Sequence, residues 1–138
     1  FPKIIDNSFF AKTYCQAKLH GRAVLDSVRI LDNRCVYTVV TTDELREYGC
    51  TVKATDGIVD QLRIIEGVEI AFLLYQTGNP GEYKVSLRTN SAVDVSRIAQ
   101  SFGGGGHVKA AGCTMTGEPQ EIVEKISGKI REQWEELK

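Results

Sequence analysis

The sequence predicts an α/β (α+β) fold in which helices pack against a mixed β-sheet within a single domain. Its 138 residues suit one domain, and 42% of them are hydrophobic, which is enough to form a buried core. Four or five strand patterns and several helical patterns follow one another without the strict alternation of a doubly wound parallel sheet. The formal charge of -1 excludes a protein that holds nucleic acid by bulk positive charge, so any phosphate binding must be local.

The sequence of the N-terminal half predicts one hairpin, with helices before and after it in the chain. Phe9, Phe10, Tyr14 and Leu19 form an imperfect apolar stripe that the pair His20-Gly21 ends. Asp32-Asn33 suits a two-residue connection between antiparallel strands. The expected elements are a helix over 8–19, strands over 23–31 and 34–40, and short helices over 42–49 and 56–65.

The C-terminal half predicts a second hairpin and two amphipathic helices. Strands over 68–77 and 83–89 are joined by a turn rich in glycine and proline. Asp94 is placed as the N-cap of the next helix. A short strand over 113–115 precedes a last helix, in which Pro119 suits the first turn. One apolar stripe of that helix contains Ile122, Val123, Ile126, Ile130, Trp134 and Leu137.

The cysteines and histidines predict no metal site. Cys15, Cys35, Cys50 and Cys113 lie 20, 15 and 63 positions apart, without a Cys-x-x-Cys pair, so we expect free and mostly buried thiols. His20 is interpreted as a structural residue. No apolar run is long enough to span a bilayer and no signal peptide opens the chain, so we expect a cytoplasmic protein without membrane contact. Because the sequence starts at Phe1, we expect a piece of a longer protein.

Four successive glycines, residues 103–106, precede His107 and Lys109. Glycines allow backbone N–H groups to converge on one anion, and a helix beginning at about Gly106 would add the positive end of its dipole. His107 could offer a ring N–H to the same anion. A flexible linker and a loop that serves only tight packing are the alternatives for this run.

A strand end upstream carries a second anion-binding pattern. Arg88 closes the strand over 83–89, where its planar guanidinium can grip a phosphate with two hydrogen bonds. Ser86 lies two residues earlier on the same face, and Thr89 lies beside Arg88. Between Lys84 and Lys109 there are four basic residues and one acidic residue, so this window is positive. The alternative is that Arg88 is only a solvated strand end.

These motifs resemble the C-terminal DHH-associated domain of the DHH-family phosphoesterases, named for an Asp-His-His triplet. The resemblance rests on Gly104-Gly105-Gly106-His107-x-x-Ala110-Ala111-Gly112, preceded by Ser86-Leu87-Arg88 and by a Val93-Asp94-Val95 helix start. It extends from about Gly21 to the C-terminus. The family includes enzymes similar to the RecJ exonuclease, oligoribonucleases that dephosphorylate 3'-phosphoadenosine 5'-phosphate, and cyclic-di-AMP phosphodiesterases.

The resemblance implies that a larger N-terminal catalytic lobe, absent from this chain, holds two divalent metal ions, usually manganese. Residues 1–20 would then be the tail of a helix that connects the two lobes, and residues 21–138 the substrate-binding domain. It also implies which residues of this chain bind the substrate, and it implies that this chain has no catalytic or metal-ligating residue. Those substrate-binding residues are Arg88, Gly104, Gly105, Gly106 and His107, with Ser86, Thr89 and Lys109 beside them; Thr89 stands where many relatives have serine.

The expected function is substrate binding for a metal-dependent phosphoesterase that hydrolyses short oligonucleotides or small nucleotides. This chain alone should bind nucleotide phosphate weakly and should not hydrolyse it. Its partners would be a nucleotide or short single-stranded RNA or DNA and its own catalytic lobe, in a parent that could be a homodimer. The alternatives are the substrate domain of a cyclic-dinucleotide phosphodiesterase, an RNA-binding domain like that of alanyl-tRNA synthetases, and an interaction domain.

Overall fold

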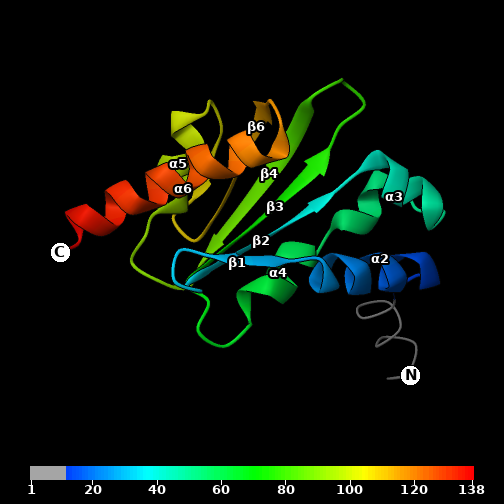
Figure 1. Cartoon of the computed structure of the whole chain (residues 1–138), viewed down its shortest axis with the longest axis horizontal. Coiled ribbons are helices and arrows are strands. Elements are labelled where there is room, and N and C mark those ends of the chain that lie inside the picture. The colour runs from blue at the N-terminus through cyan, green and yellow to red at the C-terminus, as the bar shows by residue number, and fades with distance from the viewer. Residues whose placement is uncertain (1–11) are drawn as a thin grey trace, which may run out of the picture.

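A computed structural model describes residues 12–138 as one six-stranded sheet flanked by helices (Figure 1). The strand order is β1-β2-β3-β4-β6-β5. Strands β2 and β3 are parallel and every other neighbouring pair is antiparallel, so the sheet is mixed. The predicted fold class is confirmed.

Helices and strands are interleaved along the chain. The helical segments are α2 (Tyr14–Leu25), α3 (Thr42–Glu47), the 3-10 turn η1 (Val52–Thr55), α4 (Ile58–Arg63), α5 (Val95–Ser101) and α6 (Pro119–Glu136). The strands are β1 (Val28–Ile30), β2 (Cys35–Val40), β3 (Ile70–Gln76), β4 (Glu82–Thr89), β5 (Gly105–His107) and β6 (Ala110–Thr116).

The N-terminal helix continues beyond its predicted end. Part of the predicted helix over 8–19 lies outside the described residues. Helix α2 runs past His20-Gly21 to Leu25, and the strand predicted over 23–31 is confirmed only over Val28–Ile30. The Thr13 hydroxyl accepts a hydrogen bond from the backbone N–H of Gln16 (3.1 Å) and caps the helix. Leu19 and Ala23, one turn apart, are both buried, and this packing outweighs the helix-breaking tendency of Gly21.

The connection in the first hairpin is longer than predicted, and its backbone is left-handed at three residues. Residues Ile30 and Cys35 pair across β1 and β2, so four residues connect the strands instead of two. The backbone φ angles of Leu31, Asp32 and Asn33 are 55°, 58° and 62°, all in the left-handed region. Asp and Asn tolerate this region well, which is why the sequence signal marked the turn correctly but not its length.

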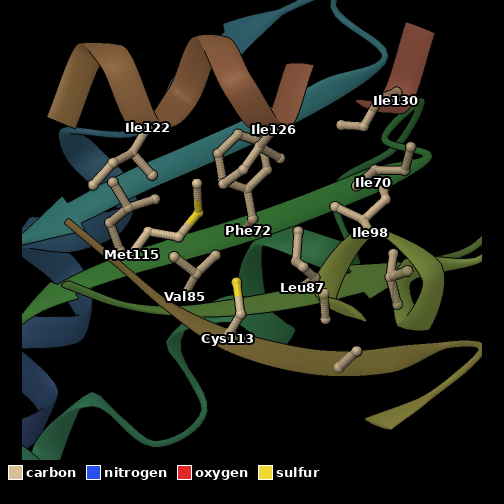
Figure 2. Close-up of a cluster of buried hydrophobic side chains, with 14 of the residues drawn as sticks. Ile70, Phe72, Val85, Leu87, Ile98, Cys113, Met115, Ile122, Ile126 and Ile130 are labelled. Atoms are coloured by element: carbon tan, nitrogen blue, oxygen red, sulfur yellow. The ribbon is translucent and has the colours of Figure 1, made fainter. Parts of the chain in front are cut away.

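The two faces of the sheet carry different helices. Alternate residues of each strand point to opposite faces. Helices α5 and α6 pack on one face, where Ile122 and Ile126 of α6 lie over Met115 and Phe72 of the sheet and Ile130 lies near Ile70 (Figure 2). Helices α2 and α4 pack on the other face, where their buried side chains meet β2 and β3. Figure 1 shows the same division, with α6 and α2 on opposite sides.

The start of α5 is fixed as predicted. The Asp94 carboxylate accepts hydrogen bonds from the backbone N–H groups of Ser96 (2.9 Å) and Arg97 (3.2 Å). A hydrogen bond from the Ser96 hydroxyl is the main cause that lowers the pKa of Asp94, and the two backbone bonds lower it further. The Gln133 side chain of α6 bonds to both the N–H and the carbonyl of Asp94, so the start of α5 is also tied to the last helix.

Helix α6 begins at Pro119 as predicted, and most of its apolar stripe is buried. Leu137 departs from the prediction, because it follows the end of α6 and is exposed. Trp134 is half-buried and packs beneath the Arg34 guanidinium, 3.7 Å from the ring centroid. Within residues 12–138, no helix combines the length and apolar character that crossing a bilayer requires.

Candidate functional site

One half of the face that carries α2 and α4 has no helix packed over it. The buried strand residues beneath α2 and α4 come from β2 and β3 only. On the neighbouring strands β4, β6 and β5, the side chains that point to this face are polar or small and are half-buried or exposed. We call this set the open face: Glu82, Lys84, Ser86 and Arg88; Ala110, Gly112, Thr114 and Thr116; Gly105 and His107.

Strand register brings four of the predicted binding residues together on the open face: Ser86, Arg88, Gly105 and His107. Arg88 pairs with Ala110, and Ala110 pairs with His107. Ser86 pairs with Gly112, which pairs in turn with Gly105. Directly paired residues project to the same side of a sheet, so Arg88 and His107 flank Ala110 in one row. Residues 19 positions apart in the sequence are thereby aligned with only alanine between them.

The glycine run begins a strand and not a helix. Gly105–His107 form β5, antiparallel to β6, so the predicted helix at about Gly106 was wrong. The N–H groups of Gly103 and Gly104 are also engaged, because they donate to the carbonyls of Gln100 (3.0 Å) and Ala99 (2.8 Å). A single nest built from four consecutive N–H groups is therefore not formed, and a helix dipole does not contribute at this point.

Two of the glycines are required by close packing against β6. A Cβ at Gly104 would lie 2.1 Å from the Gly112 carbonyl oxygen, and one at Gly106 would lie 2.6 Å from the Ala111 Cα. Gly106 also has a φ of 145°. A Cβ at Gly105, by contrast, would meet nothing within 4 Å. The tight-packing interpretation therefore holds for Gly104 and Gly106 and leaves Gly105 without a structural requirement.

The tip of the β5–β6 hairpin is held from both sides. His107 pairs with Ala110, so Val108 and Lys109 form a two-residue turn. The Lys109 carbonyl accepts a hydrogen bond from the N–H of Thr89 (3.1 Å), and the Val108 carbonyl accepts one from the N–H of Val95 (3.0 Å). These bonds to β4 and to α5 exclude the flexible-linker interpretation and fix His107 and Lys109 relative to Arg88.

A positively charged hollow of about 510 Å³ lies at the Arg88 end of the open face. It contains three cationic side chains and one carboxylate, a net charge of about +2 (3 minus 1) in a chain whose formal total is -1. Its three basic residues, Arg63, Arg88 and Lys109, are far apart in the sequence, and folding brings their positive charges together in this hollow. The lining residues are Asp60, Arg63, Arg88, Thr89, Asn90, Lys109 and Ala110.

Arg88 is oriented by Asp60. The side chain of Arg88 is 27% exposed, and its Nε donates to Asp60 Oδ1 (3.2 Å) while Nη1 donates to the Leu87 carbonyl (3.0 Å). Nη2 has no hydrogen-bond acceptor among residues 12–138, so one end of the guanidinium fork is unpaired within the described part of the chain. Arg88 is therefore held in place and is more than a solvated strand end.

Three residues of this hollow were not predicted. Asp60 and Arg63 lie one turn apart on α4, and Asn90 follows β4. The Asn90 side chain donates to the Arg63 carbonyl (2.8 Å), and Arg63 lies 3.6 Å from the Asp60 carboxylate. In the sequence, the three-residue spacing of Asp60 and Arg63 indicates only an ordinary ion pair on a helix surface. Only the packing of α4 against the end of β4 makes them neighbours of Arg88.

Other predicted binding residues are placed less favourably. Thr89 is 2% exposed and its hydroxyl is 3.3 Å from the Glu69 carbonyl, so the structure does not bring this hydroxyl to the open face. Lys109 lines the hollow and reaches the Ser91 carbonyl (3.4 Å). Arg97, part of the positive window in the sequence, instead pairs with Glu136 (3.2 Å) beside α6. His107 is exposed and does not line this hollow.

His20 is a buried structural residue, as predicted. Its Nε2 donates to the Ala54 carbonyl (2.8 Å), so Nδ1 is the acceptor for the Gln61 side-chain amide (2.6 Å). Burial is the main cause that lowers the pKa of His20 from its ordinary value of 6.5. The imidazole is therefore neutral at pH 7 and joins α2 to the segment that contains η1 and α4.

The described residues provide no metal centre and no activated thiol on the open face. Among residues 12–138, no group of three or more His, Cys, Asp or Glu side chains could hold a metal ion. The four cysteines are free, but only Cys35 and Cys113 are buried, so the prediction of mostly buried thiols held for half of them. Burial raises the pKa of Cys113 to about 11, and its side chain lies on the opposite face, within the core.

Comparison with known proteins identifies the family. The family model described as the DHHA1 domain matches residues 32–135. Over 96 residues the chain is 31% identical to the bifunctional oligoribonuclease and PAP phosphatase NrnA of Thermus thermophilus, a match that covers 69% of this chain and 29% of the relative. Over 43 residues it is 54% identical to oligoribonuclease NrnB of Bacillus subtilis, covering 30% of this chain and 11% of that protein.

The fold agrees with this assignment. A crystal structure of an exopolyphosphatase-related protein from Bacteroides fragilis superimposes with a TM-score of 0.84 and 20% identity, covering 95% of this chain and 38% of that one. The chain belongs to the DHHA1 domain family. It matches less than a third of the length of either named sequence relative.

Proposed function

We propose that this chain is the substrate-binding domain of a phosphoesterase that acts on short oligonucleotides or small nucleotides. The observation that carries the proposal is the row formed by Arg88, Ala110 and His107 at the edge of a positively charged hollow. A guanidinium, an imidazole and the Lys109 ammonium offer the donors that phosphate oxygens accept. The names of the relatives, an oligoribonuclease and a bifunctional oligoribonuclease and PAP phosphatase, support a nucleotide as the ligand.

In this proposal, residues 21–138 hold the substrate and a separate lobe cleaves it. The expected connection between the two lobes, residues 1–20, lies partly outside the described residues 12–138. Hydrolysis of a phosphodiester needs an activated water and neutralisation of charge, which two divalent cations, manganese in our proposal, would supply in that lobe. This chain contributes positioning: Arg88 and Lys109 hold a phosphate, and Gly105 lets the substrate approach the backbone closely. The parent enzyme would work in the cytoplasm, where free cysteines stay reduced.

The first test is binding of AMP and of inorganic sulfate to the 138-residue chain, followed by calorimetry or by NMR shifts. Arg88→Ala removes a charge-assisted contact worth about 1.5–3 kcal/mol, so its affinity for AMP should fall about 10- to 100-fold. The matched control is Arg97→Ala, because Arg97 is paired with Glu136 away from the open face. Equal affinity of Arg88→Ala and the unmodified chain would refute the proposed site.

A second test concerns the division of labour. The chain alone, incubated with manganese and a short RNA, should show no hydrolysis above background. In the parent enzyme, Arg88→Ala and His107→Ala should lower kcat/KM while the far-UV circular dichroism and Tm stay unchanged. Hydrolysis by the purified chain would contradict the assignment of the chemistry to another lobe, and unchanged kcat/KM in both variants would contradict the assignment of the site.

A domain that serves only in packing or in protein interaction is the second candidate, favoured by the steric need for Gly104 and Gly106. It predicts that neither AMP nor sulfate binds at the open face. The same titration therefore distinguishes the two candidates.

A further inference from the structure

Two of the four free cysteines lie together, away from the Arg88 hollow. Cys15 is in the first turn of α2 and Cys50 follows the end of α3, yet their thiols are close enough for each to shift the pKa of the other. The hollow that Cys15 lines, of about 430 Å³, is also lined by Gly49 and Thr51, the two neighbours of Cys50. The proposed function does not use this pair.

Helix caps fix the backbone at each cysteine. The Thr13 hydroxyl caps α2 and also lies 3.4 Å from the Cys15 Sγ. At the end of α3, Gly49 has a φ of 69°, and the backbone N–H of Cys50 donates to the Leu45 carbonyl (2.8 Å). A left-handed glycine followed by this bond is a Schellman turn, which sets the direction of the chain at Cys50. Local hydrogen bonds therefore hold both cysteines in place.

The two thiols differ in their surroundings. Cys15 is half-buried and lines the hollow, whose charged residues are Lys53 and Asp56. A hydrogen bond from Cys50 is the main cause that lowers the pKa of Cys15, Thr13 lowers it further, and the N-terminus of α2 favours a thiolate. Burial and the bond to Cys15 raise the pKa of Cys50 to about 11. Cys15 is therefore the better nucleophile, and Cys50 keeps its proton.

We propose that Cys15 and Cys50 form a peroxide-sensitive thiol pair that closes into an intramolecular disulfide. This modification site is separate from the nucleotide site and does not rest on the proposed function. An accessible thiolate beside a second, resolving thiol is the arrangement found in redox-sensing cysteines. In a reducing compartment such a disulfide is transient, because dithiol reductants reverse it by exchange.

The proposed reaction has two steps. The Cys15 thiolate attacks one oxygen of hydrogen peroxide, so that an S–O bond forms, the O–O bond breaks, and the hydroxide that leaves takes a proton from solvent. The Cys50 sulfur then attacks the Cys15 sulfenic acid, so that the S–S bond forms and the S–O bond breaks. The proton of Cys50 leaves with the hydroxide as a second water. Together the two sulfurs lose two electrons, and the peroxide gains them.

The other two cysteines are unreactive controls within the same chain. Cys35 and Cys113 are buried, and burial is the main cause that raises their pKa values to about 12 and about 11. A thiol that is buried and protonated reacts slowly with peroxide. Cys35 and Cys113 should therefore stay reduced while the pair is oxidised.

The test treats the reduced 138-residue chain with hydrogen peroxide at pH 7 and maps its cysteines by mass spectrometry under non-reducing conditions. The expected product is a pair of peptides linked through Cys15 and Cys50, which dithiothreitol separates again. The pair should be oxidised about 3- to 10-fold faster than glutathione. The disulfide restricts the unfolded chain, so oxidation should raise Tm by about 5–15 °C.

Two single variants assign the roles. In Cys50→Ser, Cys15 should still react, because a serine hydroxyl can donate to the thiolate, but it should stop at the sulfenic acid, which dimedone traps. In Cys15→Ser, the rate of peroxide consumption should fall at least about 10-fold, because Cys50 keeps its proton. Both substitutions change one atom at a half-buried position, so the circular dichroism spectrum should stay unchanged.

Several results would overturn the proposal. These are the absence of a linked peptide, a linkage through Cys35 or Cys113, and equal rates of oxidation in Cys15→Ser and the unmodified chain. A sulfenic acid that persists on Cys15 of the unmodified chain would show that Cys50 does not resolve it. A Tm that does not rise on oxidation would show that the bond does not fit the native fold.

Discussion

Two halves of one sheet face have opposite character in this protein. Under α2 and α4, strand β3 presents Ala71 and Leu73, which are buried against Ile58 and Leu62 of α4. On the adjacent strand β4, the residues paired with them are Arg88 and Ser86, and both are solvent-accessible. A change from apolar to polar therefore occurs between neighbouring strands 4.7–4.9 Å apart, a spacing typical of any sheet.

The difference lies in how far the covering helices extend. Helix α4 ends at Arg63, and its Asp60 forms an ion pair with Arg88 near the end of β4. On β6, next to β4, alanine and glycine point to this side of the sheet. No helix packs over these small residues, so the surface is hollow there. One half of the face is thus part of the core, and the other half is accessible to solvent. The following changes test that separation.

The largest effect is expected from the covered half. Leu62→Ala deletes a side chain that is 0% exposed and should reduce the free energy of unfolding by about 2–5 kcal/mol, because it leaves a cavity under α4. Urea denaturation measures the loss. Ser86→Ala on the open half is the control and should stay within about 0.5 kcal/mol of the unmodified chain. Similar losses for both would mean that the open half is also part of the core.

A smaller effect should separate two neighbouring glycines at the edge of the open half. Gly106→Ala places a Cβ 2.6 Å from the Ala111 Cα at a φ of 145°, and should lower stability by about 1–3 kcal/mol. Gly105→Ala has open space around it and should change stability by no more than about 0.5 kcal/mol. Thermal unfolding of the two variants provides the comparison. If Gly105→Ala were the more harmful, the strand assignment of β5 would be wrong.

The smallest expected effect is a change in how the free energy of unfolding depends on pH, and it arises from His20 on the covered half. The pKa of His20 is lower in the folded chain than its ordinary value of 6.5, because the ring is buried. As the pH falls below 6.5 the unfolded chain takes up the proton first, so stability is full above pH 6.5 and decreases toward the folded pKa. His20→Gln should show a flatter profile of unfolding free energy between pH 7.5 and 5. Identical slopes for the two proteins would contradict the lowered pKa.

The elements with strong periodicity or capping signals were predictable from the sequence. Asp94 and Pro119 mark the starts of α5 and α6, and Ile122, Ile126 and Ile130 repeat at helical spacing along one buried stripe. Local hydrogen bonding and side-chain periodicity set these features, so no tertiary contact was needed to recognise them. The extension of α2 to Leu25 was missed, since it depends on Leu19 and Ala23 packing against segments far along the chain.

The site was predictable only in part, and the glycine run shows why. Four glycines have no side-chain pattern, so the sequence could not distinguish a helix start from the strand β5. Ser86 and Arg88 were correctly placed on one strand face, because alternation along a strand is local. The places of Asp60 and Arg63 beside Arg88 could not be predicted, since they depend on the packing of α4 against β4.

The sequence by itself determined the mixed α/β class, the capped helices α5 and α6, and the residue types available for binding an anion. Tertiary structure alone decided that Arg88, Ala110 and His107 form one row, that Gly104 and Gly106 pack against β6, and that Thr89 turns inward. The physical reason is that helix periodicity and caps depend on residues within one turn. Strand order and register, by contrast, depend on hydrogen bonds between segments that the sequence separates.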